Sequence, residues 1–147
     1  MTALTAPAAA PATTAPSAPA AVQVLYFAEP IPGFPGHRDY VLVPGDAAGL
    51  LFWLQSVAPD GPRFLAVSAR DFFPDYRPVV PLPVRSDLGL VDVEQAQILC
   101  LVTVPDGDPA EATANLRAPV VVAPSTHCAR QVVQSDLGLP LRRRLRR

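Results

Sequence analysis

The chain has 147 residues, half of them apolar, which suffices for one domain with one core and leaves little for a second. Its 19 prolines and eight glycines separate the apolar residues into short runs, which excludes long helices because an internal proline removes a backbone donor and clashes with the preceding turn. The net charge of −1 has two parts: residues 29–136 are acidic, with 13 acids and seven arginines, and residues 142–147 contain five arginines. The acidic body disfavours binding of bare phosphate and suits a basic protein partner.

Residues 1–21 differ from the rest of the chain in composition. They contain ten alanines, four prolines, four threonines and one serine, without a charged or aromatic residue. Because such a segment buries too little apolar surface to offset its conformational entropy, we expect a disordered leader. It lacks the basic start of a secretory signal, and no stretch of the chain reaches the roughly 18 apolar residues of a membrane span. The sequence therefore favours a cytoplasmic protein.

Short strands separated by turns are expected from residue 22 onward. Residues 31–36 (IPGFPG) form such a turn, because glycine adopts positive φ and proline cannot donate to a strand ladder. Residues 50–57 are apolar on both faces, which is typical of a central strand. The first five strands are expected at residues 22–27, 40–43, 50–57, 64–68 and 72–76, with Pro74 marking an edge or a bend in the last.

The second half of the chain begins with a different pattern. Pro78, Pro81 and Pro83 predict an extended crossing segment, and residues 86–96 predict one or two short helical turns with an aspartate cap. Strand patterns return at residues 97–104, 112–116, 120–123 and 129–134. About nine short strands at this spacing predict an all-β fold, a small pseudo-barrel or sandwich over residues 22–141, followed by an arginine-rich tail at residues 142–147.

No constellation of catalytic or metal-binding residues stands out in the sequence. Cys100 and Cys128 lack metal-ligand spacing, and Cys100 sits in an apolar strand that suits a buried side chain. His127 and Cys128 are neighbours whose side chains would point apart on a strand, so they do not suit a nucleophile and its base. We therefore expect no enzyme, no metal and no cofactor, with His37 and His127 at the surface.

Six motifs follow one another along the chain: IPGFPG (31–36), FWLQSV (52–57), FFPDY (72–76), LCLVTVP (99–105), NLRAPVVV (115–122) and RQVV (130–133). Each is weak alone, but their content, order and spacing together are specific. They resemble the flagellar assembly factor FliW family, and the resemblance extends over residues 22–141. In place of the additional β-hairpin with which many family members begin, this chain has the Ala/Pro-rich leader.

The resemblance implies a compact β pseudo-barrel without an active site. It also implies two protein partners. One is the RNA-binding translational repressor CsrA, whose repression of flagellin mRNA is relieved by the bound protein. The other is flagellin, which withdraws the protein from CsrA as flagellin accumulates. We therefore expect a partner-switching sensor or chaperone, monomeric, with no membrane binding and no direct nucleic-acid binding.

Partner contacts are expected from aromatic residues and turns, although a purely structural role suits each of them too. Residues 72–76 at a sheet edge would offer backbone groups to a partner strand. One of Phe52 and Trp53 faces outward, since adjacent strand residues point to opposite sides. Asn115 is expected to bond to backbone in a turn, and Arg117 to pair with an acid. The candidate partner-binding residues are Ile31, Phe34, Phe52, Trp53, Phe72, Phe73, Asp75, Tyr76, Asn115 and Arg117.

The arginine-rich tail leaves one alternative open, a nucleic-acid-binding β-barrel module that contacts phosphates through residues 142–147. No base-stacking aromatic residue lies beside these arginines in the sequence. A solvated end, drawn loosely to the acidic body, is therefore favoured for the tail.

Overall fold

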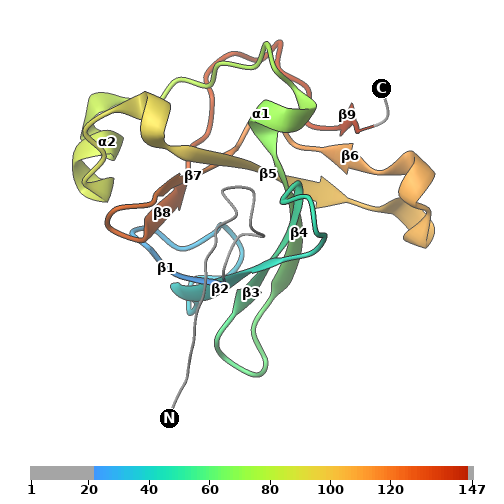
Figure 1. The fold of residues 1–147 in the computed structure, drawn as a ribbon, viewed down its shortest axis with the longest axis horizontal. Helices are drawn as coiled ribbons and strands as arrows, with labels where there is room; N and C mark the ends of the chain where they lie inside the picture. The colour runs from blue at the N-terminus through green and yellow to red at the C-terminus, as the bar shows by residue number, and fades with distance from the viewer. Residues whose placement is uncertain (1–21, 146–147) are drawn as a thin grey trace, which may run out of the picture.

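Strands dominate the computed structural model, which describes residues 22–145 (Figure 1). Seven strands close into a barrel in the order β1-β2-β3-β4-β5-β7-β8, in which the β1–β8 pairing is parallel and the others are antiparallel. This confirms the predicted all-β pseudo-barrel. Its strands are β1 (Gln23–Phe27), β2 (Asp39–Pro44), β3 (Leu51–Ser56), β4 (Arg63–Ser68), β5 (Gln97–Thr103), β7 (Val120–Ala123) and β8 (Cys128–Gln131).

Further elements extend from the barrel or cover it. β6 (Thr113–Ala114) pairs with the end of β5, and β9 (Arg143–Arg144) pairs with β6. The helical segments are α1 (Ala69–Phe72), α2 (Leu82–Leu88) and the 3-10 turns η2 (Val93–Gln95), η3 (Pro105–Gly107) and η4 (Pro109–Glu111). Within residues 22–145, no helix has the length and apolar character needed to cross a membrane.

Side chains from alternate strand positions fill the barrel interior. On β5, Leu99 points inward and is fully buried, whereas Ile98 and Cys100 belong to the cluster on the outer face. The rings of Phe27 and Tyr40 pack inside with their centroids 4.9 Å apart. The interior cluster also contains Leu25, Ile31, Leu42, Phe52, Leu54, Ala66, Val120, Val122 and Ala129.

The outward faces of β5 and β7 are buried as well, beneath a layer of helices and loops. This outer cluster includes Phe73, Val80, Val84, Leu88, Ile98, Cys100, Leu116 and Val121. It explains why residues 97–104 are apolar on both faces. Burial raises the pKa of the Cys100 thiol to about 12, so this thiol is protonated at neutral pH. The expectation of a buried Cys100 is confirmed.

The predicted strand at residues 72–76 is wrong. α1 occupies Ala69–Phe72, and a turn follows in which the Phe73 N–H donates to the Ala69 carbonyl and the Tyr76 N–H donates to the Phe73 carbonyl. The aromatic residues favour a strand locally, but burial of the Phe73 ring in the outer cluster favours this compact path.

The crossing segment also ends earlier than predicted, because Pro83 lies inside α2. Proline is tolerated there, since the first turn of a helix leaves its N–H groups without intrahelical partners. α2 ends at Gly89, whose φ of 71° is in the left-handed region that glycine adopts without strain. The predicted helical turns are confirmed, and the Asp92 carboxylate caps η2 by accepting from the Glu94 N–H at 2.9 Å.

The arginine-rich end contributes a strand that the sequence did not indicate. Arg143 and Arg144 form β9, and the Arg144 guanidinium pairs with the Glu111 carboxylate at 2.8 Å. Residues 22–145 form nine strands, the predicted number, because β9 is present and the strand predicted at residues 72–76 is not. The leader expected at residues 1–21 lies outside the described residues.

Candidate functional site

The aromatic segment of residues 72–76 lies on the outer layer and begins at the last residue of α1 (Figure 1). The Phe73 ring is buried, whereas Phe72 and Tyr76 are half-buried and Asp75 is exposed. The Tyr76 hydroxyl donates a hydrogen bond to the Leu116 carbonyl, 40 positions later in the chain. Burial, reinforced by the Cys100 thiol, raises the pKa of Tyr76 above its usual range, so the hydroxyl keeps the proton that it donates.

Arg117 holds the C-terminal segment, residues 136–145, beside these aromatic residues. Its Nε donates to the Leu139 carbonyl and one terminal nitrogen donates to the Leu137 carbonyl, both at 3.0 Å. The Leu116 N–H donates to the Pro140 carbonyl at 3.1 Å. The expected pairing of Arg117 with an acid is therefore wrong, because backbone carbonyls take its donors. The Asn115 side-chain oxygen accepts from the Arg117 N–H at 2.9 Å, as expected for a turn.

A groove of about 280 Å³ separates the aromatic residues from the C-terminal segment. One wall consists of Phe72 and Tyr76, and the other consists of Leu139 and Pro140. Arg143 also lines the groove, with its guanidinium carbon 5.2 Å from the centroid of the Phe73 ring. We call this surface the aromatic groove, and it has the apolar walls and charged margins of a peptide-binding surface.

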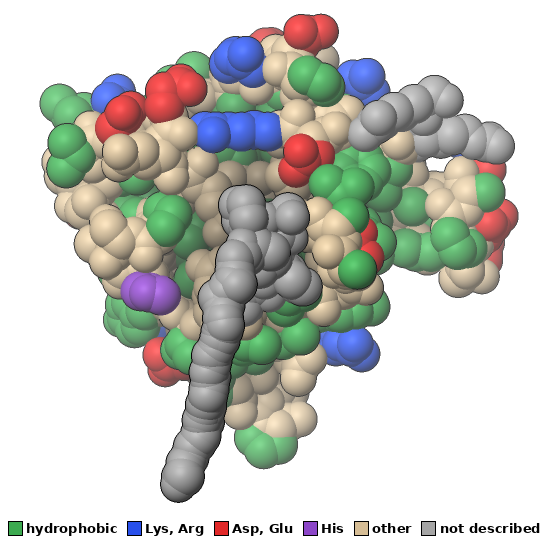
Figure 2. Space-filling model, in the orientation of Figure 1, with side chains coloured by type: hydrophobic (Ala, Val, Ile, Leu, Met, Phe, Trp, Pro, Cys, Tyr) green, Lys and Arg blue, Asp and Glu red, His purple; other side chains and the backbone are tan. Residues whose placement is uncertain are grey.

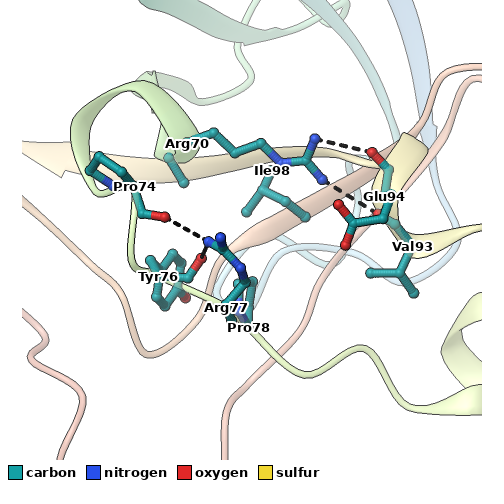
Figure 3. A pocket seen from close by; sticks show the side chains of 9 residues that line it. Arg70, Pro74, Tyr76, Arg77, Pro78, Val93, Glu94 and Ile98 are labelled. Atoms are coloured by element: carbon teal, nitrogen blue, oxygen red, sulfur yellow. Dashed lines mark hydrogen bonds between the residues drawn. The ribbon is translucent and has the colours of Figure 1, made fainter.

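A second depression, of about 220 Å³, lies on the other side of Pro74 and Tyr76 (Figure 3). Arg70 reaches across it to the carbonyls of Glu94 and Val93, at 3.0 and 3.5 Å. Arg77 donates to the carbonyl of Pro74 at 2.6 Å and to that of Tyr76 at 3.1 Å. We call this surface the arginine hollow. Nothing in the sequence singled out its two arginines, since their proximity depends on the path of residues 70–77.

The structure brings six of the ten candidate residues together at or beside the aromatic groove. Phe72, Phe73, Asp75 and Tyr76 line it directly, while Asn115 and Arg117 support its second wall. Leu139, Pro140 and Arg143 complete it, and no sequence pattern indicates them because their contacts are nonlocal.

The other four candidates lie elsewhere in the barrel. Ile31 and Phe52 are buried in the interior cluster, and the half-buried Phe34 ring packs edge-on against Phe64 at 5.5 Å. Trp53 is the outward member of its pair, and the Arg63 guanidinium lies 3.9 Å above its ring. These four residues do not form one surface with the aromatic groove.

Acidic and basic side chains are mixed on the face of the molecule in Figure 2, chiefly over its upper part. Among the described residues, Arg130 pairs with Glu29 and Asp87 at 3.5 and 3.3 Å, and Arg144 pairs with Glu111 at 2.8 Å. Local charges, more than a uniform field of one sign, would therefore orient a partner at this face.

Replacing Tyr76 by phenylalanine should lower the free energy of unfolding by about 1 to 2 kcal/mol. The substitution removes the hydroxyl donor and leaves the carbonyl of the buried Leu116 short of a partner, while the ring is kept. Equilibrium urea unfolding measures the change, with Tyr26→Phe as the control because Tyr26 is 46% exposed. Equal stability of Tyr76→Phe and the parent chain would contradict a structural role for this hydrogen bond.

The fold and its surface define a class of protein, a small closed β-barrel with a helical layer on one side and an aromatic groove on that layer. Residues 13–145 match the family model described as FliW protein. The chain belongs to the FliW family, which confirms the resemblance seen in its motifs.

Relatives cover most of the chain. The flagellar assembly factor FliW of Thermotoga neapolitana is 32% identical over 120 residues, which cover 82% of this chain and 80% of that protein. The corresponding protein of Syntrophotalea carbinolica is 37% identical over 107 residues, covering 73% of this chain and 75% of the relative. A crystal structure of the flagellar assembly factor FliW shares the fold, with a TM-score of 0.74 at 24% identity over 84% of this chain and 85% of the other.

Proposed function

We propose that this chain binds the translational regulator CsrA in the cytoplasm, relieves its repression of flagellin mRNA, and also binds flagellin as a partner-switching sensor and chaperone. The observation that carries the proposal is the family-model match over residues 13–145, because the matched relatives are flagellar assembly factors. The role is one of binding, with no chemical step assigned to any residue.

The aromatic groove is the contact surface that we propose for a protein partner. Aromatic side chains and arginine are the residues that most often dominate binding energy at protein interfaces, and the groove contains Phe72, Tyr76 and Arg143. The exposed Asp75 lies at its margin, where a carboxylate would attract a basic partner and orient it. Ile31, Phe34, Phe52 and Trp53 become secondary candidates, since burial or intramolecular contacts occupy them.

The direct test is a titration of the full chain with purified CsrA and flagellin from the same bacterium, followed by competition between them. We expect each partner to bind with a dissociation constant of about 1 µM or lower, and flagellin to displace CsrA. Binding of neither partner would overturn the proposal. Simultaneous binding of both would overturn partner switching while leaving the two separate interactions in place.

Phe72→Ala should weaken binding of CsrA or flagellin about tenfold, because truncation removes one apolar wall of the aromatic groove. Calorimetric titration measures the change, and the thermal midpoint checks that the variant is folded. The matched control is Val57→Ala, a side chain 56% exposed just after β3, in the β3–β4 turn at the end of the hairpin away from α1 (Figure 1). Unchanged affinity of Phe72→Ala for both partners would move the contact surface away from this groove.

The described residues give little support to the nucleic-acid alternative. Arg143 lies over the Phe73 ring and Arg144 pairs with Glu111, so both arginines of β9 have intramolecular partners. A phosphate would have to compete with these contacts. We therefore do not propose direct RNA binding through this strand.

A further inference from the structure

The arginine hollow combines two guanidinium groups that bind only neutral partners within residues 22–145. Arg70 and Arg77 donate to backbone carbonyls, and neither forms an ion pair with a described carboxylate. Each guanidinium has five N–H donors, of which these carbonyl contacts use only a part. Two positive charges with spare donors thus border one depression (Figure 3).

Apolar groups form much of the remaining lining of this hollow. Val93 contributes aliphatic surface, and the Tyr76 ring and Pro78 contribute flat surface, whereas Ala69 and Ile98 line the hollow but are almost fully buried. A ligand that fits the hollow therefore carries an apolar group next to its charged one. A small inorganic anion would leave this apolar surface exposed to water.

The charges around the hollow favour a single negative charge over a double one. Glu94 also lines it, so two arginines and one glutamate leave a local charge of +1. Glu94 repels a phosphate dianion more strongly than it repels a carboxylate, whose two oxygens fit the planar donors of an arginine side chain.

We infer that the arginine hollow receives a glutamate or aspartate side chain of a partner protein, next to an apolar residue of the same segment. The carboxylate accepts hydrogen bonds from Arg70 and Arg77, and the apolar neighbour covers Val93. The inference rests on the proposed role as a protein-binding module, and it adds the chemistry of one contact. It also gives the hollow a different preference from the aromatic groove, whose exposed acid is Asp75.

The test uses two blocked tripeptides as probes, alanine–glutamate–leucine and its twin alanine–glutamine–leucine, each added to the isotope-labelled full chain. Nuclear magnetic resonance follows the arginine Nε–H signals. We expect the glutamate peptide to shift the Arg70 and Arg77 signals, with affinity about tenfold or more above that of the glutamine peptide. Arg63, which lies over Trp53, should not respond.

Substitutions sharpen the test by predicting opposite signs. Arg77→Gln should lower the affinity for the glutamate peptide about fivefold. Glu94→Gln should raise this affinity about threefold, because a charge of the same sign as the peptide carboxylate is removed. Both side chains are exposed, and Glu94→Gln keeps the backbone carbonyl that accepts from Arg70. Arg77→Gln also removes the hydrogen bonds to the Pro74 and Tyr76 carbonyls, so its thermal midpoint is measured to check that the variant is folded. Arg63→Gln is the matched control and should leave the peptide affinity unchanged.

Three results would overturn the inference: equal binding of the two peptides, tighter binding of inorganic phosphate than of the glutamate peptide, or weaker peptide binding by Glu94→Gln. The proposed function is judged separately, because it fails only if CsrA and flagellin do not bind the unsubstituted chain. A chain that binds both proteins but does not distinguish the peptides would retain its function and lose this contact.

Discussion

Replacing Leu99 by alanine should lower the free energy of unfolding by about 3 kcal/mol, because the substitution opens a cavity in the barrel interior. Leu99 is fully buried, and β5 pairs with β4, β6 and β7, so the residue lies where the barrel closes. A small domain has a total stability of about 5 to 15 kcal/mol, so this loss is a large share of it. Equilibrium urea unfolding, with an unchanged slope against urea, measures the effect.

The control for this substitution is Leu82→Ala, which makes the same chemical change at the start of α2. Leu82 is 67% exposed, so its truncation should change the free energy of unfolding by less than about 0.5 kcal/mol. If Leu99→Ala cost less than about 1 kcal/mol, the interior would be loosely packed at this point, and the barrel closure described for β5 would be wrong.

The barrel could be predicted from the sequence because its signals are local. Strand residues alternate between the interior and the outer face, and the two-sided apolar pattern of residues 97–104 reflects the layer that covers β5. The opposite directions of Phe52 and Trp53 follow from the same alternation, and the structure shows which of them faces inward. Turn residues marked the boundaries between strands to within a few positions.

The candidate site could be predicted only in part, because nonlocal contacts shape it. The sequence predicts residues 72–76 as an edge strand, but they form the end of a short helix and a turn, and their aromatic character is what links the prediction to the groove. Arginine has no particular strand preference, so β9 could not be foreseen without knowing that Thr113 and Ala114 lie opposite. The aromatic groove likewise depends on Arg117 reaching carbonyls about 20 positions further along the chain.

Arg117→Ala should detach the C-terminal segment locally and lower its stability by about 2 kcal/mol, while the barrel is unchanged. The substitution removes two hydrogen bonds from a charged donor and leaves the carbonyls of Leu137 and Leu139 without them. Local opening then exposes the amides that hold the segment. Exchange of the Leu116 and Leu145 amide hydrogens should accelerate by about tenfold or more.

The pattern of exchange separates local detachment from general destabilisation. Amides of β5 and β7, such as those of Leu99 and Val121, should keep their protection, because barrel pairing does not involve Arg117. The matched control is Arg142→Ala, an exposed arginine on the same segment, which should leave all of these rates unchanged. A parallel rise of barrel and segment amides would contradict a local role for Arg117.

Detachment of the C-terminal segment also has a consequence for binding, because Leu139 and Pro140 form one wall of the aromatic groove. Arg117→Ala should therefore weaken binding of the same partner whose binding Phe72→Ala weakens, by a similar factor of about ten. The double variant should lose less than the sum of the two single losses, since either substitution already destroys the same surface. Additive losses would place the two residues at separate contacts, and the groove would then not act as one site.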